Sequence, residues 1–499
     1  MKRRSATHHV FSRRLVVSCI TGLMLGHAAV PAMAADLVEV YGLAVRYDPR
    51  IHTAEAQRNA ALENKPQAIA KLLPRIWADT GMMRGNAFVG GSAYTRNGNA
   101  GDQDRGFWSS DGTIRFNQAV YRHDLWAQLA QADDVIAEAE ASYTAEQQNL
   151  MLRTSAAYFN VLYNMASLRF AEAEQESIGR ELEQAKARYD VGIVAITDVD
   201  EAQAAHDRAR AGVIVATNDL NDAKEALRQI VGDDPGDLET LKADVPMQPP
   251  NPEDLDKWND IAQQSNLTII AANNRAEKVR KDIDIQFSGH FPTIDIVADS
   301  GFTDRAQPPY PFRSQLLEVG MRINIPIFEG GGVNSRIKQA RYTFEAATQQ
   351  LDEQRRMVRT KVKDAYRAVM SAIGQVGAFK AAIRSSESAL EATIAGMEVG
   401  TRTMVDVLYV QRQYYQNKRD FAKALQNYIV NNLALKEAAG IITAEDIEHV
   451  NSWTATAPAD RKKKGKASAS ADIPNDFDDG LIPPLTPAPA LPGSATQHR

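Results

Sequence analysis

Two long stretches of the chain predict long helices, and one of them carries the hydrophobic repeat of a coiled coil. Between residues 332 and 398, apolar positions recur at alternating steps of three and four, with one phase shift near Gln354. This pattern predicts helices that pack side by side along a heptad seam. Residues 122–189 form a second stretch without proline, and at 1.5 Å per residue each helix would be roughly 100 Å long. The seam positions are Ile337, Ala340, Phe344, Ala347, Leu351, Val358, Val362, Ala365, Val369, Ala372, Val376, Phe379, Ile383 and Leu390.

Shorter segments alternate apolar and polar residues, as β-strands do. Residues 317–327 place apolar side chains on one face and Glu318 and Arg322 on the other, and residues 294–302 set Ile296 opposite Asp295. Such segments are typical of transmembrane β-barrels, and aromatic residues at their ends suit the membrane interfaces. The pattern leaves one alternative open, which is an ordinary half-buried hairpin of a soluble protein.

The same succession of elements occurs twice along the chain. Val191-Gly192 and the following Thr197-Asp198-Val199 lie 208 residues before Val399-Gly400 and Val405-Asp406-Val407. A repeat of this length is far longer than a solenoid unit. We therefore predict one duplicated module, in which each copy runs helix, strand hairpin, long helix, helix.

We expect the first repeat at residues 35–245, with its hairpin at about 74–121, and the second at 246–455, with its hairpin at about 292–328. Four strands cannot close a barrel in lipid, since about eight is the practical minimum. An open edge in lipid would leave backbone groups unpaired. Three copies would supply twelve strands, so the predicted fold class is an α+β membrane protein with a trimeric twelve-stranded β-barrel.

Residues 1–34 have the features of a secretory signal peptide. Five basic residues precede an apolar stretch at 15–30, and Ala32-Met33-Ala34 is a small-x-small cleavage site. The only cysteine, Cys19, lies inside this segment. A lipoprotein-like site at Cys19 would leave an apolar core of only three residues, so we do not favour lipidation, although the sequence leaves it open. Without Cys19 the mature chain has no thiol, which excludes disulfides and thiol catalysis.

Net charge and hydropathy exclude further classes of protein. The chain has a net charge of −6, and removal of five basic residues with the signal peptide would leave −11. This acidity argues against nucleic-acid binding. No run of 18 apolar residues follows the first thirty, which excludes a helical multispan protein. Residues 456–499 hold seven of the 21 prolines together with clustered charges, so we predict a disordered tail.

No group of residues supports catalysis or a cofactor. The glycine-rich segment Glu329–Gly332 lacks the Lys-Ser/Thr of a phosphate-binding loop. The histidines show no pair at metal-binding spacing, and no serine lies in a Gly-x-Ser-x-Gly motif. We therefore predict no enzymatic activity, no metal and no cofactor.

Ordered motifs across residues 37–451 resemble the TolC family of outer-membrane efflux ducts. The resemblance is closer to the member that names the family than to its lipid-anchored branch. It implies a homotrimer whose outer-membrane β-barrel continues into a periplasmic barrel of α-helices. The segments that carry it are Ala157–Leu162, Val194–Val199, Leu227–Ile230, Gly289–Thr293, Pro326–Phe328 and Val399–Thr403.

The resemblance also implies a gate at the two duplicated turns, around Gly192 and Gly400. In the family, the helical end is closed at rest and opens when a periplasmic adaptor and an inner-membrane transporter dock. Drugs or secreted proteins then leave through one conduit. The duct itself is passive, so the sequence does not separate drug efflux from type I protein secretion.

Specific residues match the family's gate. Thr197 and Asp198 match positions that receive an arginine from a neighbouring copy, and Arg402 corresponds to that arginine. Asp406 matches an aspartate that rings the narrow mouth, where three carboxylates would attract cations. Thr197, Asp198 and Arg402 are thus the expected latch, and Asp406 is the expected ring.

Two positions depart from the family pattern. Tyr409 stands where the prototype has a second aspartate, which would leave one acidic ring. Met397 stands where it has a tyrosine, which would remove a hydroxyl able to hydrogen-bond Asp198. From their spacing we expect Arg402, Asp406 and Tyr409 on one helix face. The alternative to a latch is then an exposed pair of Arg402 with Asp406 within one helix.

Two classes of function remain. The first is an outer-membrane exit duct of a tripartite efflux or type I secretion system. The second is a soluble periplasmic coiled-coil adaptor or scaffold. The alternating strands separate the two, because an adaptor needs no lipid-facing surface.

Overall fold

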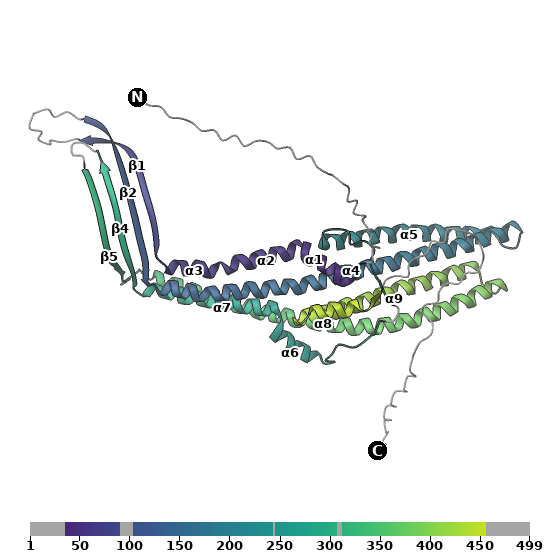
Figure 1. The fold of residues 1–499 in the computed structure, drawn as a ribbon. Coiled ribbons are helices and arrows are strands. Elements are labelled where there is room, and N and C mark those ends of the chain that lie inside the picture. Colours follow the sequence, from purple (N-terminus) through teal and green to yellow (C-terminus); the bar gives the residue numbers. More distant parts are fainter. Residues whose placement is uncertain (1–34, 90–102, 243–244, 307–311, 456–499) are drawn as a thin grey trace, which may run out of the picture.

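In a computed structural model the chain is a long bundle of helices with a β-sheet at one end (Figure 1). The structure describes residues 35–89, 103–242, 245–306 and 312–455. The expected signal peptide with Cys19 and the expected tail at 456–499 lie outside the described residues. Parts of both hairpin loops, at 90–102 and 307–311, also lie outside them.

The described elements follow the chain in this order. The helices are α1 (Leu37–Tyr47), α2 (Pro49–Leu62), α3 (Asn64–Leu72), α4 (His123–Asp190), α5 (Ile196–Val231), α6 (Leu255–Ser265), α7 (Leu267–Phe287), α8 (Gly332–Glu398), α9 (Met404–Ala439) and α10 (Ala444–Asn451). A short 3₁₀ turn covers Ser288–His290. The strands are β1 (Arg75–Val89), β2 (Gln103–Tyr121), β3 (Thr240–Leu241), β4 (Thr293–Arg305), β5 (Phe312–Asn324) and β6 (Thr454–Ala455).

The two longest helices, α4 and α8, have 68 and 67 residues, and their lengths are close to those the heptad pattern predicts. On α8 the predicted seam is the buried face, where Val358, Val362, Val369 and Val376 are all buried. Within the described ranges, no helix combines the length and the apolar character that crossing a membrane requires.

The helices form four columns that lie side by side along the rod. Away from the sheet, α5 packs on α4, α4 on α9, and α9 on α8. Toward the sheet, α2 and α3 pack on α4, and α7 packs between α4 and α8. Two of the columns consist of helices that meet end to end, and a glycine lies at each junction. Gly232, after α5, is so close to the end of α1 that an added Cβ would lie 2.9 Å from Tyr47 Cβ. Gly440, after α9, is so close to the end of α6 that an added Cβ would lie 2.5 Å from the Ser265 carbonyl oxygen. The α2–α5 column and α8 are therefore the two outer edges of the wall.

The main sheet is antiparallel, with the strand order β1-β2-β4-β5. Its register pairs Ile76 with Phe116, Ile114 with Ser300, and Ile296 with Met321. In the described residues, β1 and β5 each pair on one side only. The sheet therefore has the same two open edges as the helical wall.

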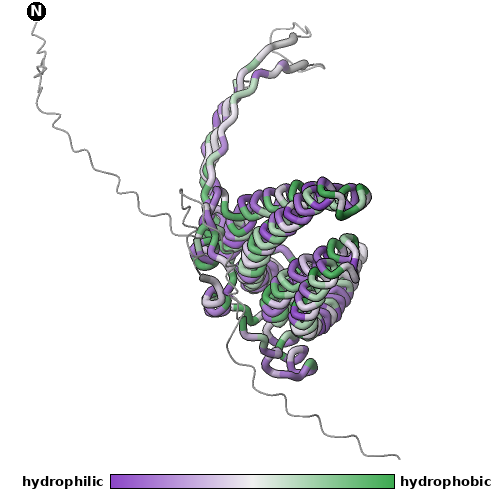
Figure 2. Tube along the Cα trace, turned by 90° about the vertical axis from the view of Figure 1, so that its right-hand side faces the viewer, coloured by the Kyte–Doolittle hydropathy of each residue, from purple (hydrophilic) through white to green (hydrophobic). Residues whose placement is uncertain are grey.

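The two faces of this sheet differ in chemistry. One face exposes apolar side chains, with Leu317, Val319 and Met82 each about three-quarters exposed. Hydrophilic and hydrophobic residues both occur along the strands of the sheet (Figure 2). The other face carries charges, and Arg115 lies 3.1 Å from Asp79 and 3.8 Å from Asp299. A single chain thus presents to its surroundings an apolar surface that a soluble protein would bury.

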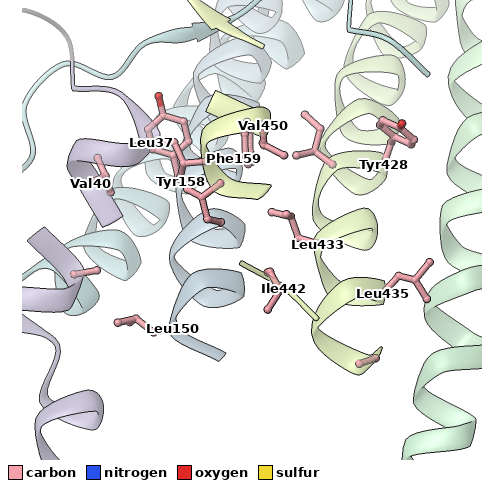
Figure 3. Close-up of a cluster of buried hydrophobic side chains, with 14 of the residues drawn as sticks. Leu37, Val40, Leu150, Tyr158, Phe159, Tyr428, Leu433, Leu435, Ile442 and Val450 are labelled. Carbon is pink, nitrogen blue, oxygen red and sulfur yellow. The ribbon is translucent and has the colours of Figure 1, made fainter. Parts of the chain in front are cut away.

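The main hydrophobic core gathers side chains from α1, from the middle of α4 and from α9 (Figure 3). Tyr158 and Phe159 of α4, Tyr428 and Leu433 of α9 and Leu37 of α1 all belong to it. Each of these fully buried side chains contributes roughly 1.5–3 kcal/mol. The Tyr158 hydroxyl lies 3.3 Å from the Glu239 carbonyl oxygen, to which it donates. This core therefore anchors the short outer segments to the long helices.

Candidate functional site

The candidate site comprises the ends of the two helical hairpins farthest from the sheet, residues 191–195 and 399–403. Each turn contains one glycine in the left-handed region, Gly192 with φ +76° and Gly400 with φ +79°. Gly192 N donates to the Tyr189 carbonyl at 2.8 Å, and Gly400 N donates to the Met397 carbonyl at 3.1 Å. A side chain would strain either turn, since residues with a Cβ rarely adopt this conformation.

The two turns are alike in backbone but differ in capping. Thr403 caps α9, and its hydroxyl accepts from Asp406 N at 3.2 Å while Asp406 Oδ2 accepts from Thr403 N at 3.0 Å. The equivalent cap of α5 is Ala195, which has no side-chain hydrogen bond to offer. Asp198 therefore occupies the same helix position as Asp406 without being held by a cap hydroxyl.

These hydrogen bonds have an electrostatic consequence. Hydrogen bonds from the backbone and hydroxyl of Thr403 hold the pKa of Asp406 below its ordinary value. Asp406 is thus ionised at neutral pH. The stabilisation that its charged form gives to the cap is present above the ordinary carboxyl pKa and is lost as the pH falls through the lowered pKa.

The capping difference can be tested by exchange of the two cap residues. Replacement Thr403→Ala removes the acceptor for Asp406 N, so amide hydrogen exchange in the first turn of α9 should become severalfold faster. The matched variant Ala195→Thr places a hydroxyl three residues before Asp198 and should slow exchange in the first turn of α5. Equal exchange rates before and after both changes would show that the cap does not hold this end.

A small apolar cluster joins the two hairpins just above their turns. It is separate from the main core, and Met397 of α8 packs against it. The cluster brings together helices α4, α5 and α9, so the two hairpin ends are held together by apolar contact. Its buried members are Ile178, Leu182, Ala185, Val199, Ala202, Met404 and Leu408.

One expectation about this end is wrong. Arg402 does not share a helix face with Asp406 and Tyr409, because α9 begins at Met404 and Arg402 precedes the cap residue. Among the described residues Arg402 forms no ion pair, but its charge is one of the causes that lower the pKa of Asp406. The alternative of a pair within one helix does not hold, because Arg402 lies outside α9. Its backbone N–H donates to the Gly396 carbonyl at 3.2 Å, and its side chain is exposed.

The other expected residues lie around the same turns. Thr197 and Asp198 are in the first turn of α5, Thr197 exposed and Asp198 half-buried. Tyr409 lies on α9 and is 61% exposed. The structure thus brings the expected residues to one end of the rod, while their roles in a gate involve a second copy and stay predictions.

Sequence reasoning missed two polar links between the hairpins. Arg419 of α9 donates to Glu174 of α4 at 2.7 Å, and both side chains are largely buried. Gln411 of α9 donates to Ser177 of α4 nearby. No spacing signal announces these contacts, because each residue alone looks like a surface position on a long helix.

This end of the rod exposes both charged and apolar side chains. Within the ranges the structure covers, no group of three or more His, Cys, Asp or Glu side chains could hold a metal ion. The carboxylates of Asp198 and Asp406 and the guanidinium of Arg402 are among the charged groups at the turns that an ion or a second chain would meet.

Comparison with known proteins agrees with this architecture. The model of the family described as outer membrane efflux protein matches residues 40–233 and 258–441. Outer membrane protein TolC of Vibrio cholerae is 34% identical over 436 residues, which cover 86% of this chain and 95% of that protein. Outer membrane protein TolC of Escherichia coli is 30% identical, with 95% of each chain covered.

A solved structure has the same fold. The crystal structure of the outer membrane protein VceC from Vibrio cholerae superposes with a TM-score of 0.66 at 19% identity, and covers 81% of this chain and 96% of that one. The family match, the identity to proteins of nearly equal length and the shared fold lead to one conclusion. The chain belongs to the TolC family of outer-membrane efflux proteins and resides in the outer membrane.

Proposed function

We propose that the chain is a passive exit duct that works as a homotrimer. The main sheet carries this proposal, since it has two open edges and one exposed apolar face. In lipid, unpaired edge groups each cost several kcal/mol, so β5 of one copy must pair with β1 of the next. Three copies would close a barrel of twelve strands, with the charged face around Arg115 lining the pore.

The same argument extends to the helices and to the duplication. The helical wall ends at α8 on one side and at the α2–α5 column on the other, and each of these edges continues an open strand edge of the sheet. Three copies would therefore also close a helical barrel.

The order of elements repeats along the chain. Helices α4 and α5 have 68 and 36 residues, and α8 and α9 have 67 and 36. This near identity of lengths supports an internal duplication.

The latch at the hairpin ends is the second part of the proposal. Arg402 is exposed and forms no ion pair with any residue that the structure describes. Asp198 lacks a cap hydroxyl such as the one of Thr403 that binds Asp406. In a closed ring of copies, Arg402 of one copy would pair with Thr197 and Asp198 of the next. Met397, which packs inward on the apolar cluster, cannot supply the hydroxyl that a tyrosine would give this latch.

Asp406 is proposed to form the acidic ring of the mouth. Three ionised carboxylates converging on one axis would concentrate multivalent cations and repel anions. Because Tyr409 stands where the family prototype has a second aspartate, the mouth would carry one acidic ring. Replacement Asp406→Ala should therefore lessen the block of single-channel current by trivalent cations added at the helical side, and Asp200→Ala is the matched control. Undiminished block in Asp406→Ala would remove Asp406 from the ring.

Opening is proposed to require partners at the hairpin ends. Val191 and Ile193 on one turn and Val399 on the other are 69–75% exposed. Exposed apolar side chains at both turns suit docking of a periplasmic adaptor, which would work with an inner-membrane transporter. Cargo choice would rest with that transporter, in efflux or in type I secretion.

Cell fractionation tests the proposed function against the soluble adaptor. An exit duct should remain in the outer-membrane fraction after salt washing and enter solution only with detergent. It should then conduct ions in planar bilayers. Release of the intact protein in a periplasmic extract without detergent would favour the adaptor and refute the duct.

A further inference from the structure

The outer edge of α8 carries a row of basic side chains that form no ion pair in the part of the chain that the structure describes. Lys380 and Arg384 are exposed and form no ion pair within the described residues, whereas Lys361, on the flank that faces α9, reaches Glu437 at 2.7 Å. We call the following set the basic edge. It consists of Arg359, Lys363, Arg367, Lys380 and Arg384.

The far side of the same helix is shaped for close approach. The buried seam of α8 continues through Val369, Ala372 and Val376, and the helix positions opposite that seam are exposed. After Arg367 in the chain, these opposite positions all hold small residues, which would let another helix approach closely. They are Ser371, Gly374, Ala378, Ala381, Ser385, Ser388, Ala392 and Ala395.

The other edge of the wall carries the opposite charge. On α5 and the residues after it, Asp219 and Asp222 are exposed, and neither forms an ion pair with a basic side chain in the described residues. We call the following set the acidic edge. It consists of Asp219, Asp222, Asp233 and Asp234.

Cross-helix contacts show that these edges lie at the same height along the rod. Lys186 of α4 meets Gln203 of α5, Asn160 of α4 meets Gln426 of α9, and Ser386 of α8 meets Asn417 of α9. Because the paired helices are antiparallel, this register places Lys380 level with Asp222 to within about one helical turn. The same register places Arg367 within about two helical turns of the level of Asp233, with Lys363 and Arg359 nearer the sheet.

We propose that the basic edge of α8 docks on the acidic edge of a second copy of this chain, so that complementary charge sets the order and height of copies in the trimer. The inference rests on the proposed trimer. Within one chain α5 and α8 are the two outer edges of the wall, so only another copy can bring them together. Complementary charges across an interface fix register and disfavour wrong pairings.

Charge reversal with rescue tests this docking. The variant Lys380→Glu/Arg384→Glu sets like charges opposite each other at three interfaces. After detergent extraction it should show roughly tenfold more monomer relative to trimer at a fixed temperature, as should Asp219→Lys/Asp222→Lys. Combining all four changes restores complementarity and should return the trimer to near the wild-type amount. The conservative variant Lys380→Arg/Arg384→Lys should behave as wild type.

The outcomes separate this inference from the proposed function. If both reversals leave the trimer unchanged, or if the combined variant stays as weak as either reversal alone, the docking of these edges is wrong although the duct stands. If the unaltered protein itself is not a trimer, the proposed function fails first.

Discussion

Replacement Arg402→Ser should raise the single-channel conductance of the closed duct severalfold. Arg402 forms no ion pair within the described ranges, and its backbone N–H is held by the Gly396 carbonyl. In the trimer its charge would hold Asp198 of the next copy, so losing it frees one link at each of three interfaces. Breaking one partner of such a pair also leaves an unpaired carboxylate, which favours separation of the ends. Planar-bilayer recording measures the change directly.

The control for this prediction is Arg412→Ser. Arg412 is also exposed on the α8–α9 hairpin, but it lies inside α9 rather than in the turn. It removes the same charge without touching the proposed latch, so its conductance should stay near the wild-type value. An unchanged conductance for Arg402→Ser, or an equal rise in both variants, would reject the latch.

Replacement Val319→Lys should abolish stable assembly in the outer membrane. Val319 is 75% exposed on the apolar face of β5, opposite Ala298 of β4. A lysine facing lipid near the middle of a barrel costs about 2–4 kcal/mol, and the trimer would pay this three times. The amount of heat-sensitive trimer in outer-membrane extracts, read on a gel, measures the loss.

The adjacent residue supplies a matched control. Glu318 lies on the other face of β5, where the strand register places it opposite Asp299 of β4. Glu318→Lys makes the same new side chain on the charged face, next to an acidic neighbour, and should leave the trimer intact. If Glu318→Lys were the damaging change and Val319→Lys the tolerated one, the assignment of the two faces would be reversed.

Long-period features of the fold were accessible from sequence. The steps of three and four in residues 332–398 predict the helix α8 and its buried seam, because heptad spacing reports packing directly. The alternation in 317–327 predicts β5 and its two faces for the same reason, but β5 ends at Asn324, so Ile325 and Ile327 lie beyond the strand. In both elements one side must be apolar, because it is buried or faces lipid. This requirement recurs at a fixed spacing over many residues, so the sequence pattern reveals it.

The local error at Arg402 had an available signal. Thr403 with Asp406 three residues later is a capping pattern, which places the helix start at Met404 and leaves Arg402 outside. Spacing by four implies a shared face only where both residues are helical. The link of Arg419 to Glu174 was not predictable, because it joins residues 245 positions apart through the packing of two hairpins.

Counting the chains in the conducting particle is the most direct test of the shared pore. The protein extracted from outer membranes in mild detergent should have the native mass of three chains, and the same particle should conduct when returned to a planar bilayer. A stable single chain in lipid that carries no current would contradict the account, since its open strand edges would then need no second copy.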